Sequence, residues 1–112
     1  MDIARGGHFE EENESDCENG QCALPPKGKY PDSAWYSYDD STCSYGCMIT
    51  EYFYWALTSI LGAQNNPQRC ENISPEWRLC NAEDVESGDK NIFKLLTDDQ
   101  YHFPKILPDG AY

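Results

Sequence analysis

The chain has 112 residues, of which 20 are Asp or Glu and 8 are Lys or Arg, so its formal net charge is −12. This excess of acid argues against nucleic acid and anionic membrane surfaces as partners, because few cations are available to neutralise phosphates. The length suits one domain with a modest core, and no apolar run reaches the roughly 18 residues of a membrane span.

Residues 1–34 are expected to hold the end of a helix followed by a variable loop. "MDIARGG" indicates the last turns of a helix, with Arg5 near its end and Gly6 or Gly7 as the stop. The rest is acidic, then rich in Pro and Gly, and buries too little apolar surface to offset its ordering entropy. No apolar signal-peptide core follows Met1, so we expect a removed leader or a start inside a longer secreted protein.

Residues 35–112 are expected to form the helical core domain. The stretch "TEYFYWALTSILGAQ" is nearly continuous in apolar residues and lies in a helix predicted over about residues 43–62. Gly62 is expected to end this helix, and Pro67 blocks its continuation. Because the helix is apolar nearly all round, it is predicted to be the central element on which the others pack.

Two weaker helices are predicted further along the chain. One begins at Ser74-Pro75-Glu76, and residues 81–89 hold a single turn. Residues 89–98 form a short amphipathic helix capped by Asp89, with its apolar side chains inward. Those inward residues are Ile92, Phe93, Leu95 and Leu96. No alternating run predicts a strand, so the fold class is mainly α: a small disulfide-stabilised helical domain around one central apolar helix, with long irregular loops.

Six cysteines in so short a chain indicate a disulfide framework and an oxidising, extracellular compartment. The simplest pairing is local, and it joins Cys17–Cys22, Cys43–Cys47 and Cys70–Cys80. The sequence alone does not choose among the possible pairings. Asn13 and Asn72 each begin an N-x-S sequon and are candidate glycosylation sites, although Pro75 follows the second sequon.

Few residues qualify for chemistry. Glu51 stands at the start of the apolar run, where it either accepts hydrogen bonds from Tyr or Trp donors or serves as a metal ligand or acid/base group in a cleft. A zinc site would need His8 and His102 beside Glu51, without a spacing that favours it. Asp39 and Asp40 are candidate Ca²⁺ ligands, although the regular calcium-loop pattern is missing. Possible cofactors are therefore calcium or zinc.

Aromatic residues crowd one segment of the chain. Such a cluster either packs around the central helix or forms a surface for a carbohydrate or a protein. The cluster consists of Tyr30, Trp35, Tyr36, Tyr38 and Tyr45.

Three stretches resemble the C-terminal portion of an uncharacterised family of secreted, metalloprotease-like proteins of marine bacteria and marine animals. They are "WYSYDDSTCSYGCMITEYFYWALTSILGAQ", "EWRLCNAEDVESGD" and "LLTDDQYHFPKILPDGAY". The resemblance covers most of the chain outside residues 8–34, and "MDIARGG" also looks like a helix of that family. It implies a full-length protein with an upstream histidine-containing helix, in which Glu51 completes a metal site. That helix has no counterpart within these 112 residues.

Two functions are therefore expected. The first is a non-catalytic extracellular structural or interaction module, a fragment of a longer secreted protein with an acidic, weakly calcium-binding surface. Its partner would be another protein or the missing N-terminal part of the same chain. The alternative is the C-terminal part of a zinc-dependent metallopeptidase-like enzyme in which Glu51 contributes to the metal site.

Overall fold

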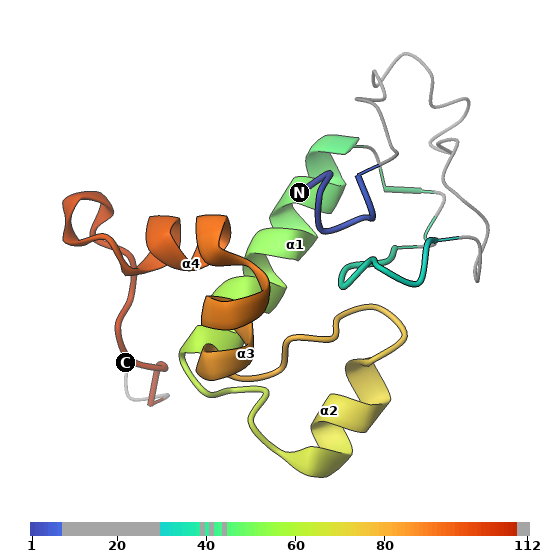
Figure 1. The fold of residues 1–112 in the computed structure, drawn as a ribbon. Helices are drawn as coiled ribbons and strands as arrows, with labels where there is room; N and C mark the ends of the chain where they lie inside the picture. Colours follow the sequence, from blue (N-terminus) through green and yellow to red (C-terminus); the bar gives the residue numbers. More distant parts are fainter. Residues whose placement is uncertain (8–29, 39, 41, 44, 110–112) are drawn as a thin grey trace.

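The computed structural model describes residues 1–7, 30–38, 40, 42–43 and 45–109 (Figure 1). Within these residues the chain forms four α-helices and no β-strand, which confirms the mainly helical fold class. The helices are α1 (Tyr45–Ile60), α2 (Pro67–Ile73), α3 (Ala82–Gly88) and α4 (Lys90–Thr97), followed by a short 3-10 helix over Asp99–Tyr101. None of them is long and apolar enough to cross a membrane.

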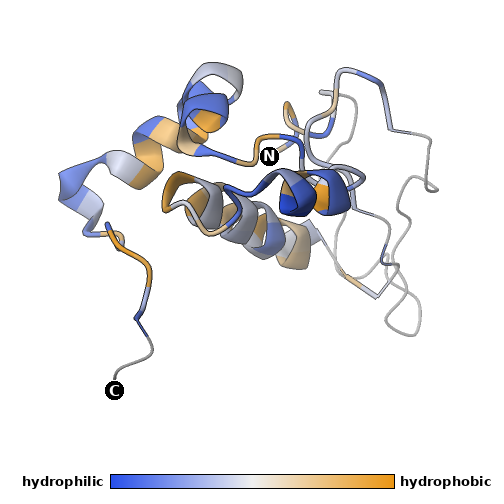
Figure 2. Cartoon of the chain, turned by 90° about the horizontal axis from the view of Figure 1, so that it is seen from below, coloured by the Kyte–Doolittle hydropathy of each residue, from blue (hydrophilic) through white to orange (hydrophobic). Residues whose placement is uncertain are grey.

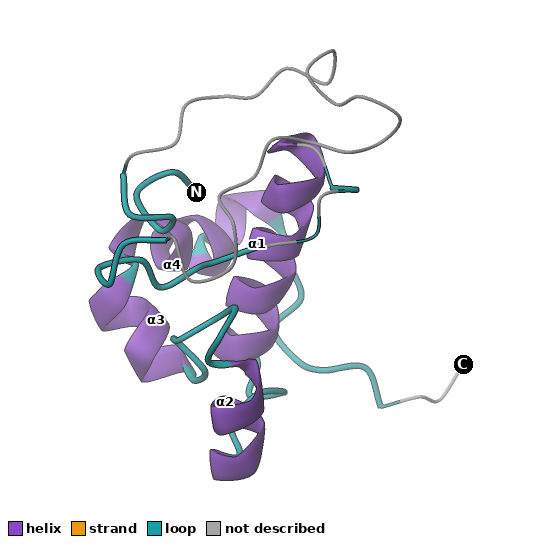
Figure 3. Cartoon of the chain, turned by 90° about the vertical axis from the view of Figure 1, so that its right-hand side faces the viewer, coloured by secondary structure: helices purple, strands orange, loops and turns teal. Residues whose placement is uncertain are grey.

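Helix α1 is the central element, as predicted. Helices α3 and α4 pack against it and against each other, while α2 lies beyond its C-terminal end (Figures 1 and 3). Its last turn closes through two hydrogen bonds: Gly62 N donates to Ser59 O at 3.1 Å, and Ala63 N donates to Thr58 O at 2.9 Å. Gly62 has a φ of +86°, a left-handed conformation that residues other than glycine rarely adopt. The helix therefore ends at the predicted glycine.

The core gathers around three aromatic rings. Tyr36 and Trp77 are completely buried, and Tyr52 from α1 packs against both, with ring centroids 5.6 and 6.0 Å away. Tyr36 and Trp77 also pair through an isolated antiparallel bridge, which joins the segment before α1 to the segment after α2. Trp77 Nε1 donates to Ser59 Oγ at 3.0 Å, so this deeply buried indole has a polar partner.

Residues 1–7 pack against this core through Ala4. They form a hydrogen-bonded turn in which Gly6 N donates to Ile3 O and Gly7 N donates to Asp2 O, the pattern that closes helices. The turn replaces the predicted helix end but keeps its stop geometry, because Gly6 has a φ of +93°. A Cβ there would also lie 2.7 Å from Pro31 Cγ. Ala4, at 1% exposure, is part of the apolar core.

The prediction that the second helix begins at Ser74 is wrong. The helix lies about two turns earlier, because Asn66 caps it and Pro67, expected only to end α1, occupies its first turn. Asn66 Oδ1 accepts from Gln68 N at 3.0 Å and from Arg69 N at 3.2 Å. A proline is tolerated at this position because its missing N–H would have no helical partner. Ser74 caps the other end.

The last two helices agree better with the predictions. Helix α3 is longer than the single predicted turn, and Asn81 caps it by accepting from Asp84 N at 2.9 Å. Helix α4 begins at the residue after Asp89, the predicted cap. Ile92 and Leu96 are buried as predicted, whereas Leu95 is 39% exposed.

Two of the predicted disulfides are present. Cys43–Cys47 lies at the head of α1 with its Cα atoms 5.3 Å apart, and Cys70–Cys80 has a Cα separation of 5.6 Å. The Cys17–Cys22 pair lies outside the described residues. Both observed bridges are typical of proteins from an oxidising environment.

The chain beyond α4 is largely exposed. Phe103 contacts Phe53 of α1 with ring centroids 5.2 Å apart, and Ile106 is 80% exposed. Figure 2 shows the apolar stretch of this segment close to the C-terminus.

Candidate functional site

Glu51, the carboxylate singled out in the sequence, is half-buried on α1. Among the residues that the structure describes, its side chain forms no hydrogen bond or ion pair, so neither Tyr nor Trp donors hold it. No group of three or more His, Cys, Asp or Glu side chains that could hold a metal gathers in the described ranges. His102 is exposed at the end of the 3-10 helix, and His8 lies outside the described residues.

Only one of the two candidate calcium ligands lies among the described residues. Asp39 lies outside the described residues, and Asp40 is exposed before α1. Asp40 Oδ1 accepts from Thr42 Oγ1 at 2.7 Å and from Thr42 N at 2.9 Å. These bonds lower the pKa of Asp40, and they account for the residue as part of a local turn.

Among the described residues, the buried carboxylate is that of Asp89. It is 7% exposed, and its Oδ2 accepts from Tyr52 Oη at 2.6 Å and from Trp35 Nε1 at 3.0 Å. Its Oδ1 accepts from Ile92 N at 3.3 Å, which caps α4. Burial and this carboxylate raise the pKa of Tyr52. Every bond of Asp89 points inward, so this network holds the core together.

A second pair of tryptophan and carboxylate has a different setting. Trp55 Nε1 donates to Glu76 Oε1 at 2.7 Å, which joins α1 to the segment after α2. The Arg69 guanidinium lies over the Trp55 ring at 5.6 Å from its centroid, a cation–π distance. Unlike Asp89, all three side chains line an open pocket.

This Trp55 pocket has a volume of about 530 Å³, within the range of small-molecule sites. Its walls come from three parts of the chain: the segment before α1, helix α1 itself and the stretch from α2 to Arg78. The lining residues are Tyr30, Asp32, Ser37, Tyr38, Trp55, Arg69, Asn72, Ile73, Pro75, Glu76 and Arg78.

Two arginines give the pocket its chemistry. Arg69 Nε donates to Gln64 Oε1 at 2.7 Å, and Arg78 Nη1 donates to the backbone oxygen of Asp32 at 2.9 Å. Neither guanidinium group forms an ion pair with a carboxylate among the described residues. These partners are all neutral, so within the described part of the chain neither positive charge is compensated by a direct contact with a carboxylate, although the net charge is −12.

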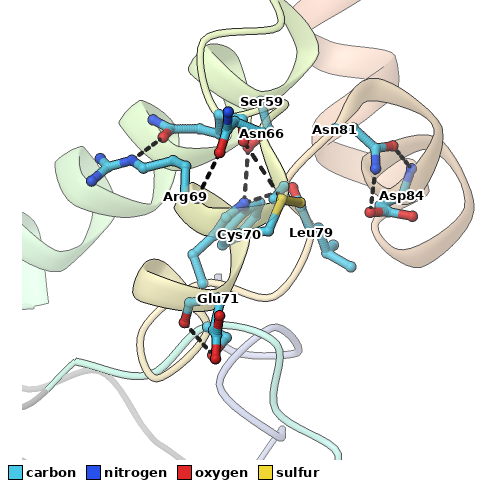
Figure 4. Close-up of a disulfide and its surroundings, with 12 residues drawn as sticks. Ser59, Asn66, Arg69, Cys70, Glu71, Leu79, Asn81 and Asp84 are labelled. Carbon is cyan, nitrogen blue, oxygen red and sulfur yellow. Dashed lines mark hydrogen bonds between the residues drawn. A yellow bond between two sulfur atoms is a disulfide. The ribbon is translucent and has the colours of Figure 1, made fainter.

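The Cys70–Cys80 disulfide fixes the two arginines relative to one another. Cys70 follows Arg69 on α2, and Cys80 lies two residues after Arg78. Figure 4 shows the Arg69 and Cys70 side chains leaving α2 on different sides. Helix α2 makes few direct contacts with the other helices, so this bridge and the buried Ile73 connect it to the rest of the fold.

Another cavity, of about 400 Å³, lies between the end of α1, the end of α4 and the following segment. Ile60, Leu96 and Phe103 supply apolar walls, and His102 and Lys105 stand among its polar lining residues. Lys105 is occupied by an ion pair with Asp99, which lowers the pKa of that carboxyl group. This cavity therefore offers less polar recognition than the Trp55 pocket.

Some side chains of the aromatic segment pack in the core, and others line a pocket, so neither alternative predicted from the sequence applies to the whole segment. Tyr36 is core, Trp35 bonds to Asp89, and Tyr45 Oη donates to the Asp2 carboxylate at 3.0 Å. Tyr30 and Tyr38 instead line the Trp55 pocket. Sequence reasoning missed Arg69, Glu76 and Arg78. The available signal was the placement of both arginines beside the Cys70–Cys80 loop in an acidic chain.

No protein-family model, curated protein or solved structure matches this chain significantly.

Proposed function

We propose that this chain is a non-catalytic extracellular interaction module that takes a polar ligand into the Trp55 pocket. The observation that carries the proposal is the pocket itself: an indole, two carboxylates and two arginines line one opening, and neither arginine has a carboxylate partner among the described residues. Sites of this kind combine apolar area with a few oriented polar groups, which set specificity.

The pocket is held ready for binding. Trp55 is fixed by Glu76 and covered by Arg69, and the Cys70–Cys80 bridge ties α2 to the following segment. A preorganised site loses less side-chain entropy when a ligand binds. The two disulfides and the resemblance to secreted proteins support a location outside the cell.

The other expected functions receive less support. A weakly calcium-binding surface remains compatible with the acidic charge, but no described cluster of acids defines a site. The zinc-peptidase alternative needs histidines beside Glu51, and the described residues bring none into such a group. We therefore place the ligand site at Trp55 and not at Glu51.

The test uses the indole N–H signals of the isotopically labelled chain in NMR titrations. Neutral and acidic galactose-based oligosaccharides are the probes, because hydroxyl groups match the mixed donors and acceptors of the pocket. Binding in the pocket is expected to shift the Trp55 signal and to leave Trp77 unchanged, since Trp77 bonds inside the core. Absence of any selective Trp55 shift at millimolar probe concentrations would overturn the proposal.

A pair of substitutions on α2 supplies the matched control. Asn72→Tyr places a bulky side chain on the pocket wall, whereas Gln68→Tyr adds the same group at an exposed position outside the lining. The first variant is expected to abolish the Trp55 shift and the second to retain it. Equal behaviour of the two variants would place binding elsewhere on the surface.

A further inference from the structure

We infer that the ligand of the Trp55 pocket is an acidic saccharide, a sugar that carries a carboxylate, recognised by Arg69 and Arg78. The inference rests on the proposed function and narrows it to a ligand class. Both guanidinium groups keep N–H donors beyond those used by Gln64 and the Asp32 backbone oxygen. A carboxylate accepts two parallel bonds from such a fork and would supply the missing negative partner.

The carboxylates of the same pocket restrict the ligand further. Glu76 uses Oε1 to accept from Trp55, and the exposed Asp32 side chain forms no hydrogen bond with described residues. The Asp32 carboxylate is an acceptor when ionised, so a matching ligand must bring donors as well as negative charge. The hydroxyl groups of a sugar are donors, and Asn72 and Ser37 add neutral polar groups to the walls.

Simple anions match this set less well. Inorganic sulfate at neutral pH offers acceptor oxygens only, and it would meet repulsion from Glu76 and Asp32. A neutral sugar offers donors to Asp32 and leaves both arginines without a carboxylate partner. A carboxylated sugar satisfies both kinds of group, and the half-buried rings of Tyr30 and Tyr38 offer apolar wall for its carbon skeleton.

The experiment compares trigalacturonate with the neutral galactose trisaccharide of the same linkage, using the full chain with its disulfides intact. Isothermal titration calorimetry gives the affinities, and the Trp55 indole signal reports the site. Trigalacturonate is expected to bind at least about tenfold more tightly, because the charged hydrogen bonds are available only to it. Its affinity should also fall as salt is added.

Substitution of the arginines tests their role. Arg69→Gln and Arg78→Gln are each expected to weaken trigalacturonate binding at least about tenfold and to change neutral-sugar binding less. Lys94→Gln is the control, because it removes the same charge from exposed α4 outside the pocket. An unchanged Trp77 signal in each variant verifies the fold.

The outcomes separate the two proposals. Equal affinity for the neutral and acidic trisaccharides, or arginine variants that behave like Lys94→Gln, would overturn the acidic-saccharide inference and leave the pocket as a binding site. Sulfate that shifts Trp55 as strongly as trigalacturonate would replace the saccharide with a general anion site. Failure of every probe to shift Trp55 would overturn both proposals.

Discussion

The molecule uses the same pair of groups twice, with opposite results. Half-buried Trp35 donates to the buried carboxylate of Asp89, and buried Trp55 donates to the half-buried carboxylate of Glu76 at the wall of an open pocket. Asp89 also accepts from Tyr52 and from the N-terminus of α4, so its removal would leave several groups without partners. Glu76 lies where water can replace a lost bond. The comparison teaches that a tryptophan–carboxylate bond indicates a ligand site only where the surrounding side chains leave it open.

The largest loss of stability is expected when the hydrogen bond between Trp35 and Asp89 is broken. Asp89→Ala should lower the free energy of unfolding by about 3–5 kcal/mol, because Tyr52 and Trp35 lose an acceptor and α4 loses its cap. Urea unfolding followed by circular dichroism measures this loss. Asp98→Ala is the matched control, since Asp98 caps only the short 3-10 helix through Gln100 N. A similar small loss in both variants would contradict a structural role for the Asp89 network.

Removal of the Cys70–Cys80 bridge tests whether this disulfide supports the Trp55 pocket. The double variant Cys70→Ser, Cys80→Ser should lose about 2–3 kcal/mol, because the unfolded chain regains the freedom of a closed loop. It should also weaken ligand binding, since Arg69 and Arg78 are no longer held in register. The measurements are urea unfolding and the Trp55 titration. Cys43→Ser, Cys47→Ser is the control, and equal loss of binding in both variants would show a general effect.

Alkaline pH tests how much the buried tyrosines Tyr36 and Tyr52 contribute to stability. Burial raises the pKa values of Tyr36 and Tyr52, so the folded chain retains their protons longer than the unfolded chain does. Their stabilising contribution is therefore complete below about pH 10 and is lost as the pH rises further, at up to about 1.4 kcal/mol per pH unit for each group. Urea unfolding at several pH values measures the slope.

Two single variants serve as tests of this slope. Tyr36→Phe and Tyr52→Phe should each make the alkaline loss shallower, because one titrating group disappears. Recovery of the neutral-pH signal after return from alkali excludes covalent damage. A slope that neither variant changes would mean that other groups cause the loss.

The hydrogen bond between Trp55 and Glu76 is expected to contribute less to stability. Glu76→Ala should cost about 1 kcal/mol, because Glu76 is half-buried at the pocket wall, where water can take its place as acceptor for the N–H of the buried Trp55. Urea unfolding gives the loss, and NMR should show a large displacement of the Trp55 signal. A cost equal to that of Asp89→Ala would erase the distinction between the two pairs.

The smallest effect is expected at Glu51. Its side chain is half-buried and has no hydrogen-bond partner among the described residues, so Glu51→Gln should change the unfolding free energy by less than about 0.5 kcal/mol. Thermal or urea unfolding would measure it. A loss above about 1.5 kcal/mol would restore the prediction that this carboxylate is structural.

Local signals predicted the elements that local chemistry decides. The apolar run predicted α1, Gly62 predicted its end, and Asp89 predicted the start of α4. The second helix shows where such signals stop being sufficient, because Asn66-Pro67 and Ser74-Pro75 are equivalent as helix starts. The chain uses the first because the segment after α2 leads Trp77 into the core, where it pairs with Tyr36.

The candidate site was less accessible to sequence reasoning for a physical reason. Its groups come from positions spread between Tyr30 and Arg78, and no periodic pattern connects them. Glu51 is a candidate in the sequence because it interrupts an apolar run. The carboxylate that accepts from Trp55 Nε1 is instead Glu76, which lies far along the chain. Aromatic richness correctly indicated that rings would gather, but only the packing separates core Tyr36 from pocket-lining Tyr38.

The backbone oxygen of Ala4 affects the hydrogen exchange of two amides. Ala4 O accepts from Trp35 N at 2.9 Å and from Tyr36 N at 3.0 Å, so a single carbonyl shields two amides next to the core. Deuterium uptake at these two amides therefore reports whether residues 1–7 remain docked. Loss of that turn would give both amides fast exchange together, before Trp77 or α1 becomes accessible, and would give the detachment of the N-terminal segment its own spectroscopic marker.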